Sequence, residues 1–265
     1  MSSESIDAKA IAEQLDAAWQ NNAPIEPLSE SIGLSSVDDA YAIQTHWTNM
    51  RLERGEKITG RKIGLTSLKV QQQLGVDEPD YGAIWESSYF KTENCRAEVP
   101  ASDFLQPRVE AELAFLMGRE LQGPHITPQD VLAATDALGL VIEIVASRIA
   151  DWRIKLVDTI ADNASYGGYV MGEWDESLRE ADLRLLGVTA HKNGEFASEG
   201  VSAAAMGHPA VSVAWLANKL SDFGVSLHPG DVLLSGSVTS MLPAAAGDTF
   251  SFMMTGQPPL HLHFS

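Results

Sequence analysis

The sequence predicts an α+β fold in which a mainly helical N-terminal region precedes a larger, β-rich body. Apolar residues recur at helical spacing in the first part of the chain. From about residue 80, short aliphatic and β-branched runs alternate with turn signals. The chain has 265 residues, 45% of them hydrophobic, which suffices for a sizeable core. We expect a helical region over residues 1–75 and a β-rich body over residues 76–265, which can form one continuous domain.

The N-terminal region contains three helix signals. The apolar face of the first helix consists of Ile11, Leu15, Ala18 and Trp19. Ser36 and Asp39 have the spacing of a capping box that opens a second helix. After the basic, glycine-punctuated stretch RGEKITGRKIG (54–64), a short helix LKVQQQL (68–74) is expected to end at Gly75.

The remaining elements follow in order. VEAELAFLMG (109–118) and LGLVIEIVASR (138–148) are typical of strands, and Thr127-Pro128 between them is a well-formed helix start. Residues 208–224 predict a helix opened by Pro209 and capped by His208. PGDVLLSGS (229–237) and AGDTFSFMM (246–254) predict strands entered through Gly-Asp turns.

Charge and cysteine content limit the class of protein. With 18 basic and 36 acidic residues the formal charge is −18, which disfavours binding to nucleic acid or anionic membranes. Cys95 is the only cysteine, so no intrachain disulfide can form, and this fits a reducing cytoplasm. Neither a signal peptide nor an apolar run of about 18 residues is recognisable, so we expect a cytoplasmic protein. Dinucleotide, P-loop, zinc-protease and serine-hydrolase motifs are also absent from the sequence.

Three glutamates occupy positions that are unusual for strands. Period-two geometry places Glu110 and Glu112 on one strand face, and Glu143 interrupts the apolar run LVIEIV. Salt bridges to Arg108 or Arg148, or an exposed strand edge, are the ordinary explanations. Oxygen ligands without a neighbouring His or Cys instead favour magnesium or manganese, which would also offset the repulsion among the carboxylates.

Other polar groups are candidates for a pocket. Lys62 lies between glycines in GRKIGLTS, and Asp80 lies in DEPDYG; a solvated lysine and a turn aspartate are the alternatives. Asn163 and Ser165 stand before two glycines, where a polar turn is equally compatible. Ser237 and Thr239 could bind a carboxylate or simply end a strand. For His261 and His263, which alternate near the C-terminus, we favour an exposed edge strand over a metal pair.

Several segments, in order along the chain, resemble the 2-oxopent-4-enoate (2-hydroxypenta-2,4-dienoate) hydratases. These enzymes belong to the hydratase/decarboxylase group of the fumarylacetoacetate hydrolase superfamily. The segments are GRKIGLTS, QQLGVDEPDYG, PRVEAELAF, the glutamate in LVIEIVASRI, DWRIKLVDTIADNAS, GHP with VAWLANKL, and GDVLLSGS. The resemblance covers the chain from about residue 10. The C-terminal TGQPPLHLHFS departs from many relatives, and its two prolines put the geometry of the last strand in question.

The resemblance implies a distorted β-barrel or rolled mixed sheet with an N-terminal α-helical region, in a cytoplasmic homo-oligomer. It implies Mg²⁺ or Mn²⁺ on Glu110, Glu112 and Glu143, and proton transfer by Lys62 and Asp80. Asn163, Ser165 and Ser237 would contact the substrate. The implied activity is a hydro-lyase reaction on 2-hydroxypenta-2,4-dienoate in aromatic meta-cleavage catabolism. The resemblance also allows a complex with another enzyme of that pathway.

Two groups of alternatives remain at this stage. A 4-oxalocrotonate decarboxylase or a 2-oxohept-4-ene-1,7-dioate hydratase would share the metal site but would need cations for a second carboxylate. Arg148, Arg153 and Lys155 could serve that purpose. A non-catalytic partner subunit that retains the fold is the alternative of a different class.

Overall fold

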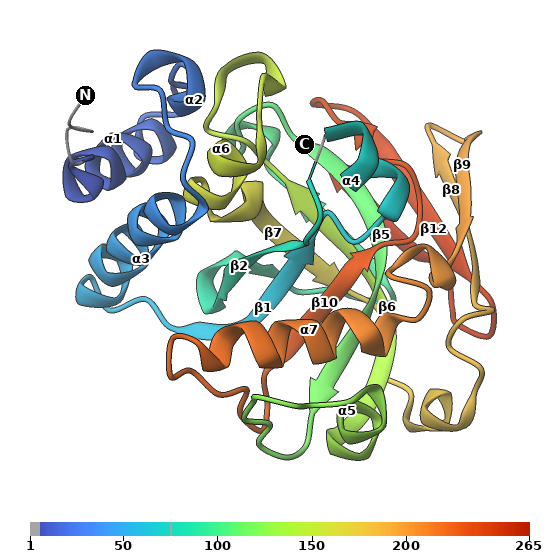
Figure 1. Ribbon diagram of the computed structural model, residues 1–265. Helices are drawn as coiled ribbons and strands as arrows, with labels where there is room; N and C mark the ends of the chain where they lie inside the picture. Colours follow the sequence, from blue (N-terminus) through green and yellow to red (C-terminus); the bar gives the residue numbers. More distant parts are fainter. Residues whose placement is uncertain (1–5, 75) are drawn as a thin grey trace.

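The computed structural model describes residues 6–74 and 76–265, and it arranges helices and strands as an α+β fold (Figure 1). The helices are α1 (Ala8–Gln20), α2 (Leu28–Ser31), α3 (Val37–Glu53), α4 (Leu68–Leu74), α5 (Pro128–Ala134), α6 (Leu156–Ala161) and α7 (Pro209–Ser221). The first seven strands are β1 (Ile58–Gly64), β2 (Asp80–Trp85), β3 (Tyr89–Phe90), β4 (Arg96–Val99), β5 (Arg108–Met117), β6 (Thr135–Val145) and β7 (Tyr166–Met171). The others are β8 (Gly187–Lys192), β9 (Glu195–Val201), β10 (Val232–Ser237), β11 (Leu242–Pro243), β12 (Thr249–Met254) and β13 (Leu260–Phe264).

The expected helix starts are confirmed in atomic detail. The Ser36 hydroxyl accepts a hydrogen bond from the Asp39 N–H at 3.2 Å, and Thr127 and Asp130 form a reciprocal capping box before α5. His208 caps α7, because its Nδ1 accepts from the Ala210 N–H at 3.0 Å. Gly75, the expected end of α4, lies outside the described residues. Within the described ranges, no helix is both long and apolar enough to cross a membrane.

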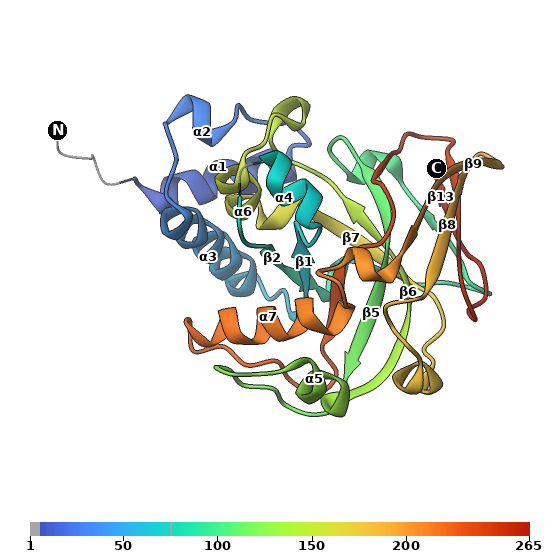
Figure 2. The same ribbon diagram turned by 45° about the vertical axis from the view of Figure 1, so that its right-hand side comes forward.

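Two mixed sheets form the β-rich body. The larger has the order β2-β1-β10-β5-β6-β7-β3, with β11 added beside β5, and the smaller has the order β4-β13-β12-β8-β9. Figure 2 shows the larger sheet curling beside α3 and α7, with the smaller sheet on the opposite side of the molecule. The predicted rolled mixed sheet with helices at its N-terminal side is confirmed.

The curl of the larger sheet gives it an inner and an outer face with different partners. Outward side chains such as Leu113, Phe115 and Ile142 pack into the main core with the smaller sheet. On the inner face, Ala114 and Val141 belong to a second, smaller apolar cluster. Because side chains alternate along a strand, Glu110 and Glu112 of β5 share the inner face with Ala114. The inner face therefore changes from apolar to acidic along the same two strands.

Two features differ from the sequence expectations. The glycine-punctuated stretch before residue 65 contains β1, which pairs with β2 and runs parallel to β10, so one strand lies between α3 and α4 within the N-terminal region. The last strand is not an exposed edge, because β13 lies between β12 and β4. His261 and His263 bond through Nδ1 to the hydroxyls of Ser251 and Thr249 at 2.6 and 3.1 Å. The two prolines precede β13 and leave its ladder intact.

Candidate active site and metal centre

Strand register brings the three unusual glutamates together. Glu110 of β5 stands directly opposite Glu143 of β6, and Glu112 lies two residues further along β5, opposite Ser237 of β10. One carboxylate oxygen from each glutamate lies within 4.8 Å of the others. Like charges that face each other across a ladder destabilise a sheet. A cation or bound protons among these groups would reduce that repulsion.

Three oxygens of this cluster accept no hydrogen bond from the described residues, although Lys62 forms an ion pair with one of them. Glu112 Oε1 and both oxygens of Glu143 are buried without a hydrogen-bond partner among the described residues. The other oxygen of Glu112 accepts from the Gly236 N–H at 2.6 Å. Gly236 has φ +106°, and a Cβ there would lie 2.0 Å from Thr66 Oγ1, so only glycine fits this bulge. Unpartnered, convergent carboxylate oxygens are a donor set that fits a hard divalent cation.

The electrostatics of the cluster support the same conclusion. Burial and the Glu143 charge raise the pKa of Glu110 to about 7. Burial, Glu143 and Glu110 raise the pKa of Glu112 well above its usual range, and burial raises that of Glu143 although Lys62 opposes it. Without a metal the cluster therefore retains protons near neutral pH. A divalent cation would take their place.

Lys62 and Asp80 flank the carboxylates on the same inner face. Lys62 Nζ lies 3.2 Å from Glu143 Oε1 and donates to the Ala164 carbonyl at 3.0 Å. Burial alone would lower the pKa of Lys62, but Glu143 and Asp80 outweigh it and raise that pKa. Burial also raises the pKa of Asp80, whose Oδ1 has no partner among the described residues. A Cβ at Gly64 would lie 2.1 Å from Asp80 Oδ1 and 3.2 Å from Lys62 Nζ, so this glycine leaves room for both.

The residues directly after α6 form a left-handed turn that brings Ser165 to the cavity. Asn163, Ala164 and Ser165 have φ values of 53°, 52° and 53°, an unusual run for residues with a Cβ. Both ends of the Asn163 amide bond to the Ala83 backbone: Oδ1 accepts at 2.7 Å and Nδ2 donates at 3.0 Å. Asn163 thus lies behind the cavity wall and does not line it. The expected substrate contact finds no support in this geometry, whereas Ser165 does face the cavity.

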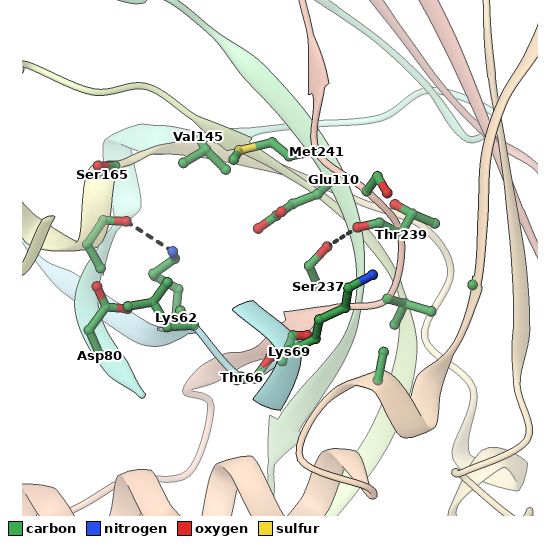
Figure 3. A pocket seen from close by; sticks show the side chains of 18 of the residues that line it. Lys62, Thr66, Lys69, Asp80, Glu110, Val145, Ser165, Ser237, Thr239 and Met241 are labelled. Carbon is green, nitrogen blue, oxygen red and sulfur yellow. Dashed lines mark hydrogen bonds between the residues drawn. The ribbon is translucent and has the colours of Figure 1, made fainter. Parts of the chain in front are cut away.

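These groups surround one cavity of about 550 Å³. Of the predicted residues, Lys62, Asp80, Glu110, Ser165 and Ser237 line it, and the buried Glu112 and Glu143 lie beside Glu110. In Figure 3, Lys62, Asp80 and Ser165 lie on one side of the cavity, with Glu110, Ser237 and Thr239 across from them. Ser237 donates its hydroxyl proton to the Thr239 carbonyl at 2.6 Å. Lys62 and Asp80, which can carry protons, therefore lie across the cavity from a wall that contains the Glu110 carboxylate and two hydroxyl groups.

The basic residues proposed for a second carboxylate are used elsewhere. Arg148 is buried against Asp162 at 2.5 Å, and Arg153 pairs with Glu26 and Glu30 at 2.6 Å. Neither these arginines nor Lys155 line the cavity. The Arg108 guanidinium, an alternative partner for Glu110, instead stacks over Trp152, 4.2 Å from its ring centroid. The lysines among the described lining residues are Lys62 and Lys69.

Some lining residues had no signal in the sequence. Thr66 and Lys69 come from the segment after β1, Trp152 from the loop after β6, and Glu199 from β9 of the smaller sheet. Side chains from these three separate segments share no common motif. Their convergence depends on how the two sheets are placed, which local sequence patterns do not specify.

Comparison with known proteins agrees with this geometry. The family model for the fumarylacetoacetate (FAA) hydrolase C-terminal region matches residues 60–264. A 2-keto-4-pentenoate hydratase of Paraburkholderia xenovorans (strain LB400) is 45% identical, over 96% of this chain and 93% of its own. A 2-hydroxyhexa-2,4-dienoate hydratase of Comamonas testosteroni is 40% identical, over 96% of both chains.

A solved structure extends the likeness to three dimensions. The 4-oxalocrotonate decarboxylase of Pseudomonas putida G7, complexed with magnesium and adipate, is 32% identical and superposes with a TM-score of 0.92 over 97% of both chains. The catalytic body, the carboxylate cluster and these relatives lead to one assignment. The chain belongs to the fumarylacetoacetate hydrolase family, in the group that contains the 2-keto-4-pentenoate hydratases.

Proposed function

We propose that this protein is a hydro-lyase that converts 2-hydroxypenta-2,4-dienoate, the enol of 2-oxopent-4-enoate, into 4-hydroxy-2-oxopentanoate. The observation that carries the proposal is the convergence of Glu110, Glu112 and Glu143 beside Lys62 and Asp80 at one cavity. The names of relatives that match nearly the whole chain support the same reaction. This reaction belongs to the meta-cleavage catabolism of aromatic compounds.

A divalent cation, Mg²⁺ or Mn²⁺, is the cofactor that the donor set favours. Glu110, Glu112 and Glu143 would hold it through carboxylate oxygens. When bound, such an ion offsets the carboxylate charges and polarises the oxygens of a 2-oxo acid. Every other task falls to side chains of the protein.

Proton transfer is the task of Asp80 and Lys62. The enol loses its hydroxyl proton and gains one at C5; water then adds its hydroxyl at C4 and its proton at C3. Each step is balanced in protons, so a group that takes up and returns one proton suffices. Asp80 has the raised pKa and the unpartnered oxygen that this exchange needs. Lys62 holds Asp80 and Glu143 in place by its positive charge and attracts the anionic end of the substrate.

Hydroxyl groups complete the polar contacts. Ser165 and Ser237 line opposite sides of the cavity (Figure 3). Their hydroxyl protons are donated to Asp162 and to the Thr239 carbonyl, so each hydroxyl would have to rotate to donate to the substrate carboxylate or carbonyl. Asn163 contributes indirectly, by fixing the turn that presents Ser165. We further propose that the enzyme acts in the cytoplasm as a homo-oligomer, in keeping with its single cysteine and the family resemblance.

The test offers the purified protein 2-hydroxypenta-2,4-dienoate and 4-oxalocrotonate separately, with Mg²⁺, with Mn²⁺ and after chelation. Loss of the dienoate absorbance with formation of the 4-hydroxy-2-oxo acid, dependent on metal, is the expected result. Carbon dioxide release from the second substrate alone would reject the hydratase and favour the decarboxylase. Turnover of neither would favour a non-catalytic partner subunit, against which the complete set of Lys62, Asp80 and the three glutamates argues.

A further inference from the structure

One buried hydroxyl group of the cavity wall has no task in the proposed reaction. Thr159 of α6 lines the cavity and is 6% exposed. Its Oγ1 lies 3.4 Å from Ser165 Oγ, and Ser165 donates to Asp162 Oδ2 at 3.2 Å. In Figure 3, Ser165 lies on the same side of the cavity as Lys62 and Asp80. The Thr159 hydroxyl therefore belongs to the part of the wall that carries the proton-transfer groups.

Gln44 of α3 fixes the distance between Thr159 and Asp80. Its Nε2 donates to the Tyr81 carbonyl at 2.8 Å and to the Ile160 carbonyl at 2.9 Å. Tyr81 directly follows Asp80 on β2, and Ile160 directly follows Thr159 on α6. One buried amide therefore ties the backbone beside the carboxyl group to the backbone beside the hydroxyl group.

A second anchor holds the first turn of α6. Asp158 Oδ1 accepts from the Ser29 N–H at 2.8 Å, and its Oδ2 accepts from the Ser29 hydroxyl at 2.7 Å. The same Oδ2 accepts from the Lys155 N–H at 2.8 Å. Neighbouring residues of a helix do not face the same way, so Asp158 can bind Ser29 while Thr159 faces the cavity. The helix that presents Thr159 is thus fixed at two points.

A hydroxyl group suits the Asp80 carboxyl in both of its protonation states. Burial raises the pKa of Asp80, and Lys62 and then a hydrogen bond from the Thr159 hydroxyl oppose that rise. A hydroxyl is both a donor and an acceptor. It can donate to ionised Asp80, and it can accept from protonated Asp80 or turn its own proton towards Ser165. A group that shuttles protons changes its charge in each cycle, so a partner for both states keeps its orientation constant.

We propose that Thr159 is a positioning residue whose hydroxyl orients the Asp80 carboxyl group for proton transfer. The proposal rests on the proposed function, in which Asp80 moves the protons. Asp80 Oδ1 has no partner among the described residues, so this oxygen is available to the substrate while the hydroxyl holds the group. The reaction needs no additional reactant, because Thr159 has its own proton again at the end of each cycle.

The first test removes the hydroxyl and keeps the shape of the side chain. In Thr159→Val, kcat for 2-hydroxypenta-2,4-dienoate should fall about 10–100-fold with a smaller change in KM, as expected for a misoriented catalytic group. Thr159→Ser returns a hydroxyl to the same position and should restore most of the lost kcat. Wild-type kcat in Thr159→Val, or no recovery in Thr159→Ser, would overturn the proposal.

Thr135→Val is the matched control for the loss of a buried hydroxyl. Thr135 is 2% exposed, and its hydroxyl donates to the Val131 carbonyl at 2.8 Å, outside the cavity. This variant should lower the Tm about as much as Thr159→Val while kcat stays at the wild-type value. Equal losses of kcat in the two variants would assign Thr159 a purely structural role and reject the proposal.

Hydrogen exchange separates this proposal from the proposed reaction. 2-Oxopentanoate has no double bond to hydrate, but its C3 hydrogens lie next to the carbonyl group. With the Mg²⁺-loaded protein in D₂O, a base removes one C3 proton and a deuteron takes its place, which NMR follows. Slower exchange in Thr159→Val but not in Thr135→Val supports the positioning role even if no dienoate is hydrated, in which case only the proposed reaction fails. Wild-type exchange in Thr159→Val rejects that role even if the wild-type protein hydrates the pentadienoate.

Discussion

Lys62 Nζ lies 3.2 Å from Glu143 Oε1, and the two side chains are 4% and 0% exposed. This ion pair stands in the middle of a cluster that also contains Glu110 and Glu112. One ammonium group cannot neutralise three carboxylates, and the raised pKa values of all three record that shortage. The ion pair therefore leaves net negative charge on the ionised cluster, and a bound divalent cation would neutralise that charge.

Replacing Lys62 should separate catalysis from metal binding. In Lys62→Met, kcat should fall by about 10²–10⁴-fold, the usual contribution of a proton-transfer group. Mn²⁺ affinity should rise or stay unchanged, because a positive charge next to the carboxylates has been removed. Steady-state kinetics and calorimetric Mn²⁺ titration measure the two effects. Lys57→Met, which removes an exposed lysine paired with Glu86 at 3.3 Å, is the control and should change neither. Loss of metal binding in Lys62→Met would contradict this assignment.

Metal removal should change how stability depends on pH. The Glu110 pKa of about 7 is above its ordinary value of 4.5, so the folded metal-free protein binds protons that the unfolded chain has already released. Stability from this group is therefore fully present below the unfolded pKa and is lost as pH rises through the folded pKa. A bound divalent cation removes that loss. The rise in Tm on adding Mn²⁺ to chelator-treated protein should thus be larger at about pH 8 than at about pH 5. Thermal melts at both pH values test this, and an equal or smaller rise at the higher pH would refute it.

Glu112→Gln should weaken metal binding and stabilise the metal-free fold at the same time. The amide oxygen can still accept from the Gly236 N–H, now at 2.6 Å from Glu112 Oε2, so the bulge is retained. At a pH where Glu112 is ionised, the substitution removes one negative charge from the metal-free cluster, and in the metal-loaded protein it removes one ligand. Affinity for Mn²⁺ should fall at least about tenfold, since even partners of metal ligands contribute about 10–100-fold. Glu98→Gln, on a strand of the smaller sheet, is the control. Wild-type affinity and turnover in Glu112→Gln would show that the site has been misidentified.

Local patterns were sufficient for part of this site. Period two along one strand placed Glu110 and Glu112 on a common face, and the charge in LVIEIV marked Glu143, which the register then set opposite Glu110. Cap residues such as Ser36 and Thr127 also predicted where helices begin. Each of these signals depends on residues within one element, which is why sequence alone reveals it.

Features that depend on distant partners could not be read in this way. β1 has no alternating pattern, and it is a strand because β2 and β10 pair with both its edges. Arg148 looked available for a substrate because its partner Asp162 is brought to it only by the fold. Asn163 looked like a pocket residue for the same reason, since its partner Ala83 lies on a strand 80 residues away.

Asn163 gives the last prediction, because its side chain controls Lys62 through the backbone. The amide bonded to Ala83 anchors the left-handed turn, and the next residue in that turn, Ala164, offers its carbonyl to Lys62 Nζ at 3.0 Å. Left-handed residues with a Cβ cost about 1–3 kcal/mol each and persist only where neighbours hold them. The two hydrogen bonds between Asn163 and Ala83 thus act as a clamp on the turn. Without this clamp, the Ala164 carbonyl should move away from Lys62.

Asn163→Ala should therefore lower kcat about 10–100-fold with a smaller change in KM, and it should also lower the Tm. The molecule supplies a matched control in Asn218, whose amide makes the same pair of bonds to the Ile126 backbone, at 2.8 and 2.9 Å, away from the cavity. Asn218→Ala removes an equivalent clamp and should cost comparable stability while kcat stays at the wild-type value. Kinetics and thermal melts of both variants decide the matter, because equal effects on kcat would mean that Asn163 only stabilises the fold. A loss of kcat confined to Asn163→Ala would mean that the turn positions Lys62 or Ser165 for the reaction, since the Asn218 side chain supports neither residue.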